Sequence, residues 1–153
     1  MDFQLQSPAF KDKGDIPELY TCKGKELSPA LAWTSAPAGT VSFALIVEDP
    51  ITSFWAVSHW VVYNIPPDKS ELAEGIPHVG SLPDGTCQGK NFKRDNGYMG
   101  PCPIRGTRTY RFTIFALDTM FGANPGMRRA GLLRAMKGHI LAEASIVGHS
   151  TKK

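Results

Sequence analysis

The chain has no apolar run that approaches the roughly 20 residues needed to cross a bilayer, so no transmembrane segment is predicted. Its first residues also lack the charged and apolar stretches of a secretory signal peptide, and we therefore expect a cytoplasmic protein. Cysteine is scarce, with only Cys22, Cys87 and Cys102. An odd number of cysteines without an export signal favours free thiols over disulfides.

Dense basic patches and metal-binding cysteine spacings are missing as well. The formal net charge is only +3 and the Lys and Arg residues are dispersed, so nucleic acid is not an expected partner. No CxxC pair or Cys/His spacing typical of zinc occurs, and neither a metal nor another cofactor is predicted. The mild positive charge favours a small anionic ligand.

Glycine and proline are abundant, with 15 and 12 residues, which is too many for a helical bundle. The 153 residues fit a single domain, predicted over 1–153. Alternating or β-rich patterns predict strands at residues 2–6, 31–33, 42–48, 57–65, 108–118 and 140–147, and a helical turn is expected within 69–75.

One helix is predicted near the C-terminus. Asn124 is a suitable N-cap, Pro125 suits the first helical position, and Gly138 suits the end. Its expected apolar stripe is Met127, Ala130, Leu133 and Met136. Strands in series with one good helix indicate a mainly β fold, a β-sandwich of antiparallel or mixed sheets with this helix and a few short helical turns.

Three of the strands carry an ionisable residue at the end of an apolar face, because side chains alternate between the two faces of a strand. The shared faces are Phe43, Leu45, Val47 and Asp49; Val57, His59, Val61, Tyr63 and Ile65; and Arg108, Tyr110, Phe112, Ile114 and Ala116. If the strand ends meet, their polar residues line one pocket at the rim of the core: Asp49, His59, Arg108 and Tyr110.

Structural roles are also open for these residues. His59 can be a core histidine, Asp49 can cap a turn, and Tyr110 can simply pack. The segment 97–106 (GYMGPCPIRG) favours a pocket instead. Two prolines around Cys102, between flanking glycines, make a stiff loop whose N–H groups can face an anion.

The chain resembles the phosphatidylethanolamine-binding protein family, in particular its small bacterial and archaeal, Raf-kinase-inhibitor-like branch. The order and spacing of seven segments carry the resemblance over nearly the whole chain: IPELYTCKGKELSPALAW (16–33), SFALIVEDP (42–50), HWVVYNIP (59–66), PDGTCQGKN (83–91), GYMGPCPIRG (97–106), YRFTIFALD (110–118) and AMKGHILAEASIVG (135–148). The resemblance implies a β-sandwich with a small pocket that takes phosphate, acetate or a phosphoethanolamine-like group.

The resemblance also assigns the ligand-binding residues one by one. Asp49 matches the first Asp of the family's Asp-Pro-Asp segment, His59 its pocket histidine, and Tyr110 its pocket tyrosine, while Gly100 and Cys102 match its anion loop. Three positions depart from the family pattern: Ile51 replaces the second Asp, Arg108 stands where the family usually has His, and Ile104 replaces a proline.

Three functions are weighed. The favoured one is non-catalytic binding of a small anion, with regulation of a partner kinase or protease implied by the resemblance alone. The second is a hydrolase-type enzyme, with Cys102 as nucleophile and His59 and Asp49 assisting, or with His59 and Asp49 acting on a phosphoester. The position of Cys102 between prolines, away from a helix N-terminus, counts against it. The third is a structural homodimer with a vestigial pocket and an exposed Trp55 at its interface.

Arg108 faces the predicted pocket, since it shares strand parity with Tyr110. Its guanidinium can pair with Asp49 and fill the pocket, grip a bound anion, or extend into water. Anion binding is the favoured outcome. His59 is expected to carry the pH response, so that anion affinity weakens as the pH rises through the titration of its imidazole.

Overall fold

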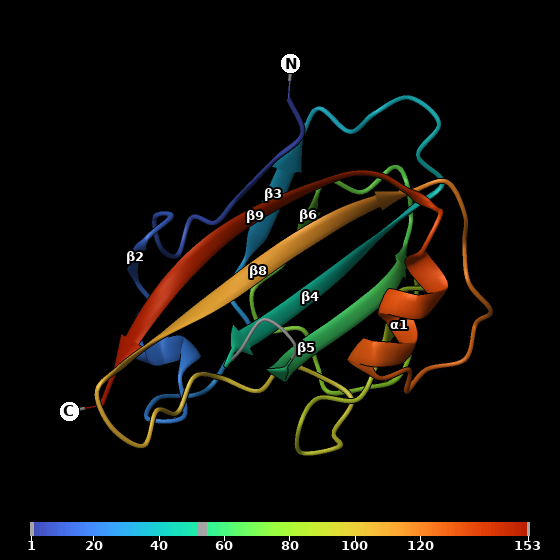
Figure 1. Ribbon diagram of the computed structural model, residues 1–153. Coiled ribbons are helices and arrows are strands. Elements are labelled where there is room, and N and C mark those ends of the chain that lie inside the picture. The colour runs from blue at the N-terminus through green and yellow to red at the C-terminus, as the bar shows by residue number, and fades with distance from the viewer. Residues whose placement is uncertain (1, 52–54, 153) are drawn as a thin grey trace.

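Two β-sheets and one α-helix form the protein, with the helix on the outer face of the larger sheet (Figure 1). The computed structural model describes residues 2–51 and 55–152. The smaller sheet has the order β1-β3-β6 and the larger one β2-β9-β8-β4-β5-β7. Strand β2 pairs with β9 in parallel and every other pair is antiparallel, so the predicted mainly β class with mixed sheets is confirmed.

The strands of the smaller sheet are β1 (Gln4–Gln6), β3 (Leu31–Thr34) and β6 (Glu71–Leu72). Those of the larger sheet are β2 (Gly14–Asp15), β9 (Ile140–Thr151), β8 (Thr107–Leu117), β4 (Ser42–Pro50), β5 (Ala56–Ile65) and β7 (Cys87–Gln88), and a 3-10 turn, η1, spans Glu18–Tyr20. Residues 69–75 therefore hold β6 and not the predicted helical turn, and β7 was missed because it is only two residues long.

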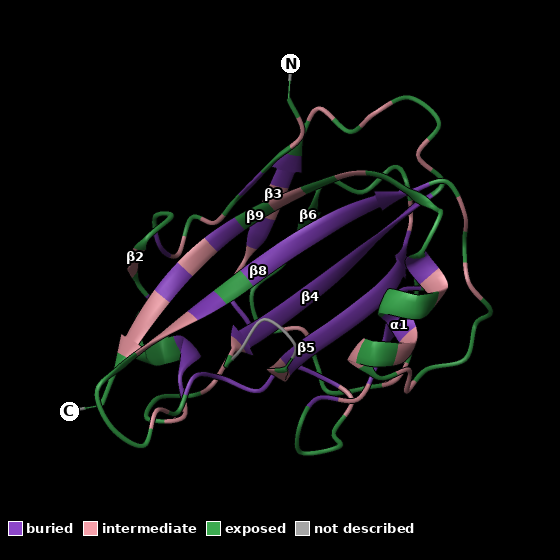
Figure 2. Cartoon of the chain, in the orientation of Figure 1, coloured by how far each residue is buried: buried purple, intermediate pink, exposed green. Residues whose placement is uncertain are grey.

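The main core lies between the two sheets. Alternate residues of β4 and β8 face inward, as parity predicted, and they pack against Leu31 and Trp33 of β3. Figure 2 shows this burial as continuous purple along β4 and most of β8. Strand β4 is paired on both sides, and both of its faces are also covered, because a second core forms on its outer face under the helix.

Helix α1 spans Arg129–Met136 and begins later than predicted. Residues before it are held in an extended segment, because the Tyr63 hydroxyl donates to the Asn124 carbonyl and accepts the Met127 N–H. Asn124 is therefore not the N-cap. The helix buries Leu132 and Met136 against β4 and β5, whereas Leu133, placed in the predicted stripe, is 37% exposed.

Strand β5 contains a β-bulge at His59, which the parity argument did not anticipate. Glu48 pairs with Ser58 and Val47 with Trp60, so His59 is the extra residue of the ladder. A bulge of this kind re-aims a side chain. As a result His59 lines a cavity on the same side of the sheet as the buried Trp60, while Val61 faces the helix side.

The prediction that β5 keeps one face from residue 57 to 65 is therefore wrong for Val61 and Tyr63, which belong to the core under α1. A second register shift between Phe43 and Leu45 returns Ile65 to the main core. Asn64, with φ of 57°, supplies the left-handed backbone conformation at this second irregularity. Its side chain also bonds to the backbone of Phe121.

The packing of α1 gives a stability prediction. Leu132→Ala should lower the free energy of unfolding by about 2–5 kcal/mol, because it empties a fully buried site. The matched control, Leu133→Ala, truncates the same kind of side chain one residue away on the exposed side of the helix. It should shift the free energy of unfolding by less than about 1 kcal/mol. Urea unfolding followed by circular dichroism measures both, and equal losses would contradict this packing.

Candidate functional site

A cavity of about 580 Å³ opens where β4 ends and where β5 and β8 begin, and the loop that follows residue 98 closes one side of it. All six residues predicted to bind a ligand line this cavity: Asp49, His59, Gly100, Cys102, Arg108 and Tyr110. Asp49 and His59 lie on adjacent strands of one sheet, as predicted. The register of the central strands therefore brings together the three strand ends that the sequence could not show to meet.

Arg108 and Asp49 form a two-point ion pair inside this cavity. The Arg108 Nε donates to Asp49 Oδ2 at 3.0 Å, and its Nη2 donates to Oδ1 at 2.6 Å. The Asp49 side chain is 11% exposed and that of Arg108 is 39% exposed. The pair supplies the buried carboxylate with a charged partner, which a buried charge requires. Of the outcomes predicted for Arg108, the structure shows the pair with Asp49.

His59 is buried, and its ring orientation is fixed from two sides. Its Nδ1 lies 2.6 Å from the carbonyl oxygen of Met99, and its ring meets the Tyr110 ring edge-on at 5.1 Å between centroids. Since a carbonyl only accepts, Nδ1 carries the proton and Nε2 of the neutral ring is an acceptor. Burial lowers the pKa of His59, partly offset by the Met99 carbonyl and Asp49, so the neutral form prevails at neutral pH.

Tyr110 is buried beside this ion pair. Burial, together with the charge of Asp49, raises the pKa of Tyr110 to about 12, so its hydroxyl keeps its proton at neutral pH. The charge of Arg108 and the neighbouring Cys102 backbone partly offset this rise in the pKa of Tyr110. Tyr110 lines the cavity, so the proton of its hydroxyl can be donated to a ligand.

The loop that contains Gly100 and Cys102 uses its N–H groups internally. The Met99 N–H donates to the His59 carbonyl at 2.8 Å, and the Gly100 N–H donates to Glu26 Oε2 at 2.9 Å. The prediction that this loop presents such donors to an anion is therefore wrong for these residues. Gly100 is needed for packing, because a Cβ there would lie 2.6 Å from the Tyr20 carbonyl oxygen.

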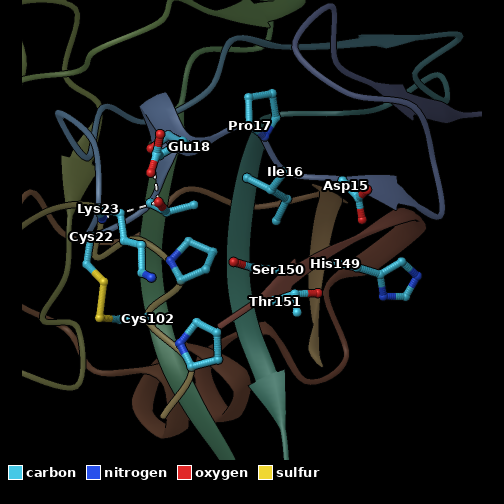
Figure 3. Close-up of a pocket in the computed structure, with 13 residues that line it drawn as sticks. Asp15, Ile16, Pro17, Glu18, Cys22, Lys23, Cys102, His149, Ser150 and Thr151 are labelled. Atoms are coloured by element: carbon cyan, nitrogen blue, oxygen red, sulfur yellow. Dashed lines mark hydrogen bonds between the residues drawn. A yellow bond between two sulfur atoms is a disulfide. The ribbon is translucent and has the colours of Figure 1, made fainter. Parts of the chain in front are cut away.

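Cys22 and Cys102 form a disulfide (Figure 3), with Cα atoms 5.4 Å apart. Cys87 is the remaining free thiol and is buried under the helix. The prediction of three free thiols is wrong. The two cysteines are 80 residues apart, and only the packing of the segment after η1 against the loop brings them together. With its sulfur bonded to Cys22, Cys102 has no thiol to serve as the nucleophile of the second hypothesis.

Further residues of the cavity were not among the ligand-binding residues predicted from the sequence. Lys93 and Arg105 add two cationic side chains to its lining. Phe92 and Ile104 add exposed apolar side chains, 60% and 83% accessible. Three cationic side chains and one carboxylate thus line the cavity, which gives it a positive bias.

Within the described ranges, no group of three or more His, Cys, Asp or Glu side chains is arranged to hold a metal ion. None of the helices in this part of the chain is long and apolar enough to cross a membrane. Trp55 is 54% exposed, as predicted for that residue.

The sequence model of the phosphatidylethanolamine-binding protein family matches residues 6–151. A UPF0098 protein of Methanothermobacter thermautotrophicus is 45% identical over 144 residues, which cover 94% of this chain and 95% of the relative. A UPF0098 protein of Aquifex aeolicus is 43% identical over 148 residues, covering 95% and 86%. The chain belongs to the phosphatidylethanolamine-binding protein family.

Two solved structures share the fold. A putative phosphatidylethanolamine-binding protein homolog, CT736 of Chlamydia trachomatis, superposes with a TM-score of 0.88 and 36% identity, covering 99% of this chain and 98% of the other. YbcL of E. coli, described as a member of the mammalian family, gives a TM-score of 0.91 and 29% identity over the full length of both chains. The sandwich is thus the fold of this family.

The buried histidine gives a prediction on pH. In the unfolded chain His59 takes up a proton near its ordinary pKa of about 6.5, whereas the folded protein takes it up only at lower pH. Stability should therefore fall as the pH drops below about 6.5, and His59→Gln should remove this part of the loss. The ring resonances of His59, followed by NMR, should titrate below the ordinary value; a midpoint at or above it would contradict the neutral assignment.

Proposed function

We propose that this protein binds a small anion that carries an acidic proton, such as inorganic phosphate, a phosphomonoester or a protonated carboxylate, and performs no chemistry on it. The observation that carries the proposal is the Arg108–Asp49 pair beside the buried His59 in one cavity. Binding of a phosphoethanolamine-like headgroup belongs to the same proposal, since the family resemblance points to it.

The ion pair with Asp49 leaves Arg108 able to bind a ligand. A guanidinium has five N–H donors, and two of them are engaged by Asp49, so three remain for an oxyanion. Asp49 holds the guanidinium plane in place, which lowers the entropy lost on binding. Pairing and anion binding are therefore compatible roles for Arg108, and the charges of Lys93 and Arg105 add to the attraction.

His59 gives the site a preference among anions. In its neutral form, the Nε2 atom can accept a hydrogen bond from a P–OH or carboxylic O–H group, and the Tyr110 hydroxyl can donate to another ligand oxygen. An anion without a proton, such as sulfate, has only acceptor oxygens, so it forms no hydrogen bond with the Nε2 lone pair and is repelled by it. At lower pH His59 gains a proton, and its positive charge then attracts any anion.

Three features support binding without turnover. Cys102 is held in the disulfide, so it offers no thiolate. The His59 Nδ1 bonds to a backbone carbonyl and Asp49 bonds to Arg108, so no carboxylate orients the imidazole as a general base. Regulation of a kinase or protease and formation of a homodimer stay predictions from the sequence.

A comparison of phosphate with sulfate tests the role of His59. At about pH 7.5 phosphate should bind at least roughly tenfold more tightly than sulfate, the worth of one good hydrogen bond. Below the pKa of His59 the two affinities should converge, because the protonated ring donates to both. Isothermal titration at constant ionic strength measures them, and equal affinities at both pH values would refute the acceptor role of His59.

The variant Arg108→Ala tests the other half of the site. It should weaken phosphate binding by about 1.5–3 kcal/mol, the range for a charged hydrogen bond. Arg111→Ala is the matched control, since it removes the same charge from β8 beside Glu48 on the opposite face of the sheet. Equal affinity of Arg108→Ala and wild type would leave Arg108 outside the site, and tighter binding would mean that it blocks the cavity.

A further inference from the structure

The Cys22–Cys102 disulfide lies between two cavities. Beside the one already described, a cleft of about 360 Å³ runs between η1, the end of β9 and residues 101–103. Figure 3 shows the disulfide at one side of this cleft, across from Ser150 and Thr151. Cys102 lines both cavities, so a chemical change at its sulfur alters the lining of each.

This disulfide is open to a reagent from solvent. Cys102 is exposed and Cys22 is half-buried, and both line the cleft. Cys87, by comparison, is 1% exposed. Access to a sulfur atom is one of the factors that decide whether a disulfide exchanges with an external thiol.

The loop beside this disulfide holds the histidine of the anion site. Met99 bonds to His59 twice, through its carbonyl oxygen to Nδ1 and through its N–H to the His59 carbonyl. The Tyr110 ring packs edge-on against His59, with 5.1 Å between the ring centroids. The position of the acceptor on His59, and of the Tyr110 ring packed against it, therefore depends on where this loop lies.

The loop is in turn fixed by the segment after η1. The Cys22 N–H donates to the Pro101 carbonyl at 3.1 Å, and the Tyr98 hydroxyl donates to the Tyr20 carbonyl at 2.8 Å. The disulfide is the covalent link of this contact. Cleaving it leaves the hydrogen bonds and the packing of the buried Tyr20 and Tyr98, and frees the exposed Cys102 end of the loop from the segment after η1.

We propose that Cys22–Cys102 is a thiol–disulfide exchange site, and that its redox state sets the affinity of the anion cavity. The disulfide form holds the loop in the binding arrangement, and the dithiol form releases it and weakens binding. The effect on affinity rests on the function proposed above, whereas the coupling between the disulfide and the loop does not.

The exchange needs an external dithiol as reductant. One of its thiolates attacks Sγ of Cys102, the more exposed of the two residues, and the S–S bond breaks with Cys22 leaving as a thiolate that takes a proton. The second thiolate of the reductant then attacks the mixed disulfide and releases Cys102. The reductant becomes a disulfide, its two protons end on Cys22 and Cys102, and two electrons have passed to the protein.

The test compares phosphate binding by the oxidised and the dithiothreitol-reduced protein at one pH, with alkylation and mass measurement to count thiols. Reduction without denaturant should weaken phosphate binding about fivefold or more, a modest coupling between two sites, and reoxidation should restore it. The double variant Cys22→Ser/Cys102→Ser should bind phosphate as weakly as the reduced protein, and dithiothreitol should not change its affinity. Cys87→Ala, the control, should respond like wild type.

Two results would overturn the proposal: a disulfide that resists reduction in the folded protein, or equal phosphate affinity in both redox states. Hydrogen exchange of the Met99 and Gly100 amides is a second readout that needs no ligand, and reduction should speed it. If neither form binds phosphate, the proposed function fails by itself. Unchanged exchange on reduction would then refute the coupling of the disulfide to the loop.

Discussion

The antiparallel pairing of β4 with both β5 and β8 is the constraint on which the site depends. It sets Glu48 opposite Ser58 and Arg111, and so places the C-terminal end of β4 beside the N-terminal ends of β5 and β8. Both faces of β4 are covered, so its register is strongly specified, because a slip by one residue would exchange its core and helix-facing side chains. Asp49 and Arg108 form their ion pair at this end of the three strands.

Asp49 and His59 are both buried, and each avoids an unpaired buried charge in a different way. Asp49 is buried and carries a partner, whereas His59 is buried and stays neutral, since burial disfavours its protonated form. The outcome is a cavity in which one guanidinium is held in place and one imidazole offers a lone pair. This arrangement is the basis of our proposal that the site discriminates ligands by their protons as well as by their charge.

The wall of the cavity comes from segments that are remote in the sequence. The loop at residues 97–103 touches β5 on one side and the segment around Cys22 on the other, and the disulfide closes this contact. Its glycine at position 100 is explained by the Tyr20 carbonyl and not by an anion. Residues that resemble a ligand-binding loop thus serve here to position His59.

The sequence by itself determined the fold class, the long strands and the inward faces of β4 and β8, because local β-propensity and a period of two record which side of a strand is buried. It also nominated six residues that line one cavity. Only the tertiary structure decided the bulge at His59, the Arg108–Asp49 pair and the Cys22–Cys102 disulfide. A bulge is a mismatch between two strands, and an ion pair or a disulfide joins groups whose distance along the chain, 59 and 80 residues here, leaves no periodic trace in the sequence.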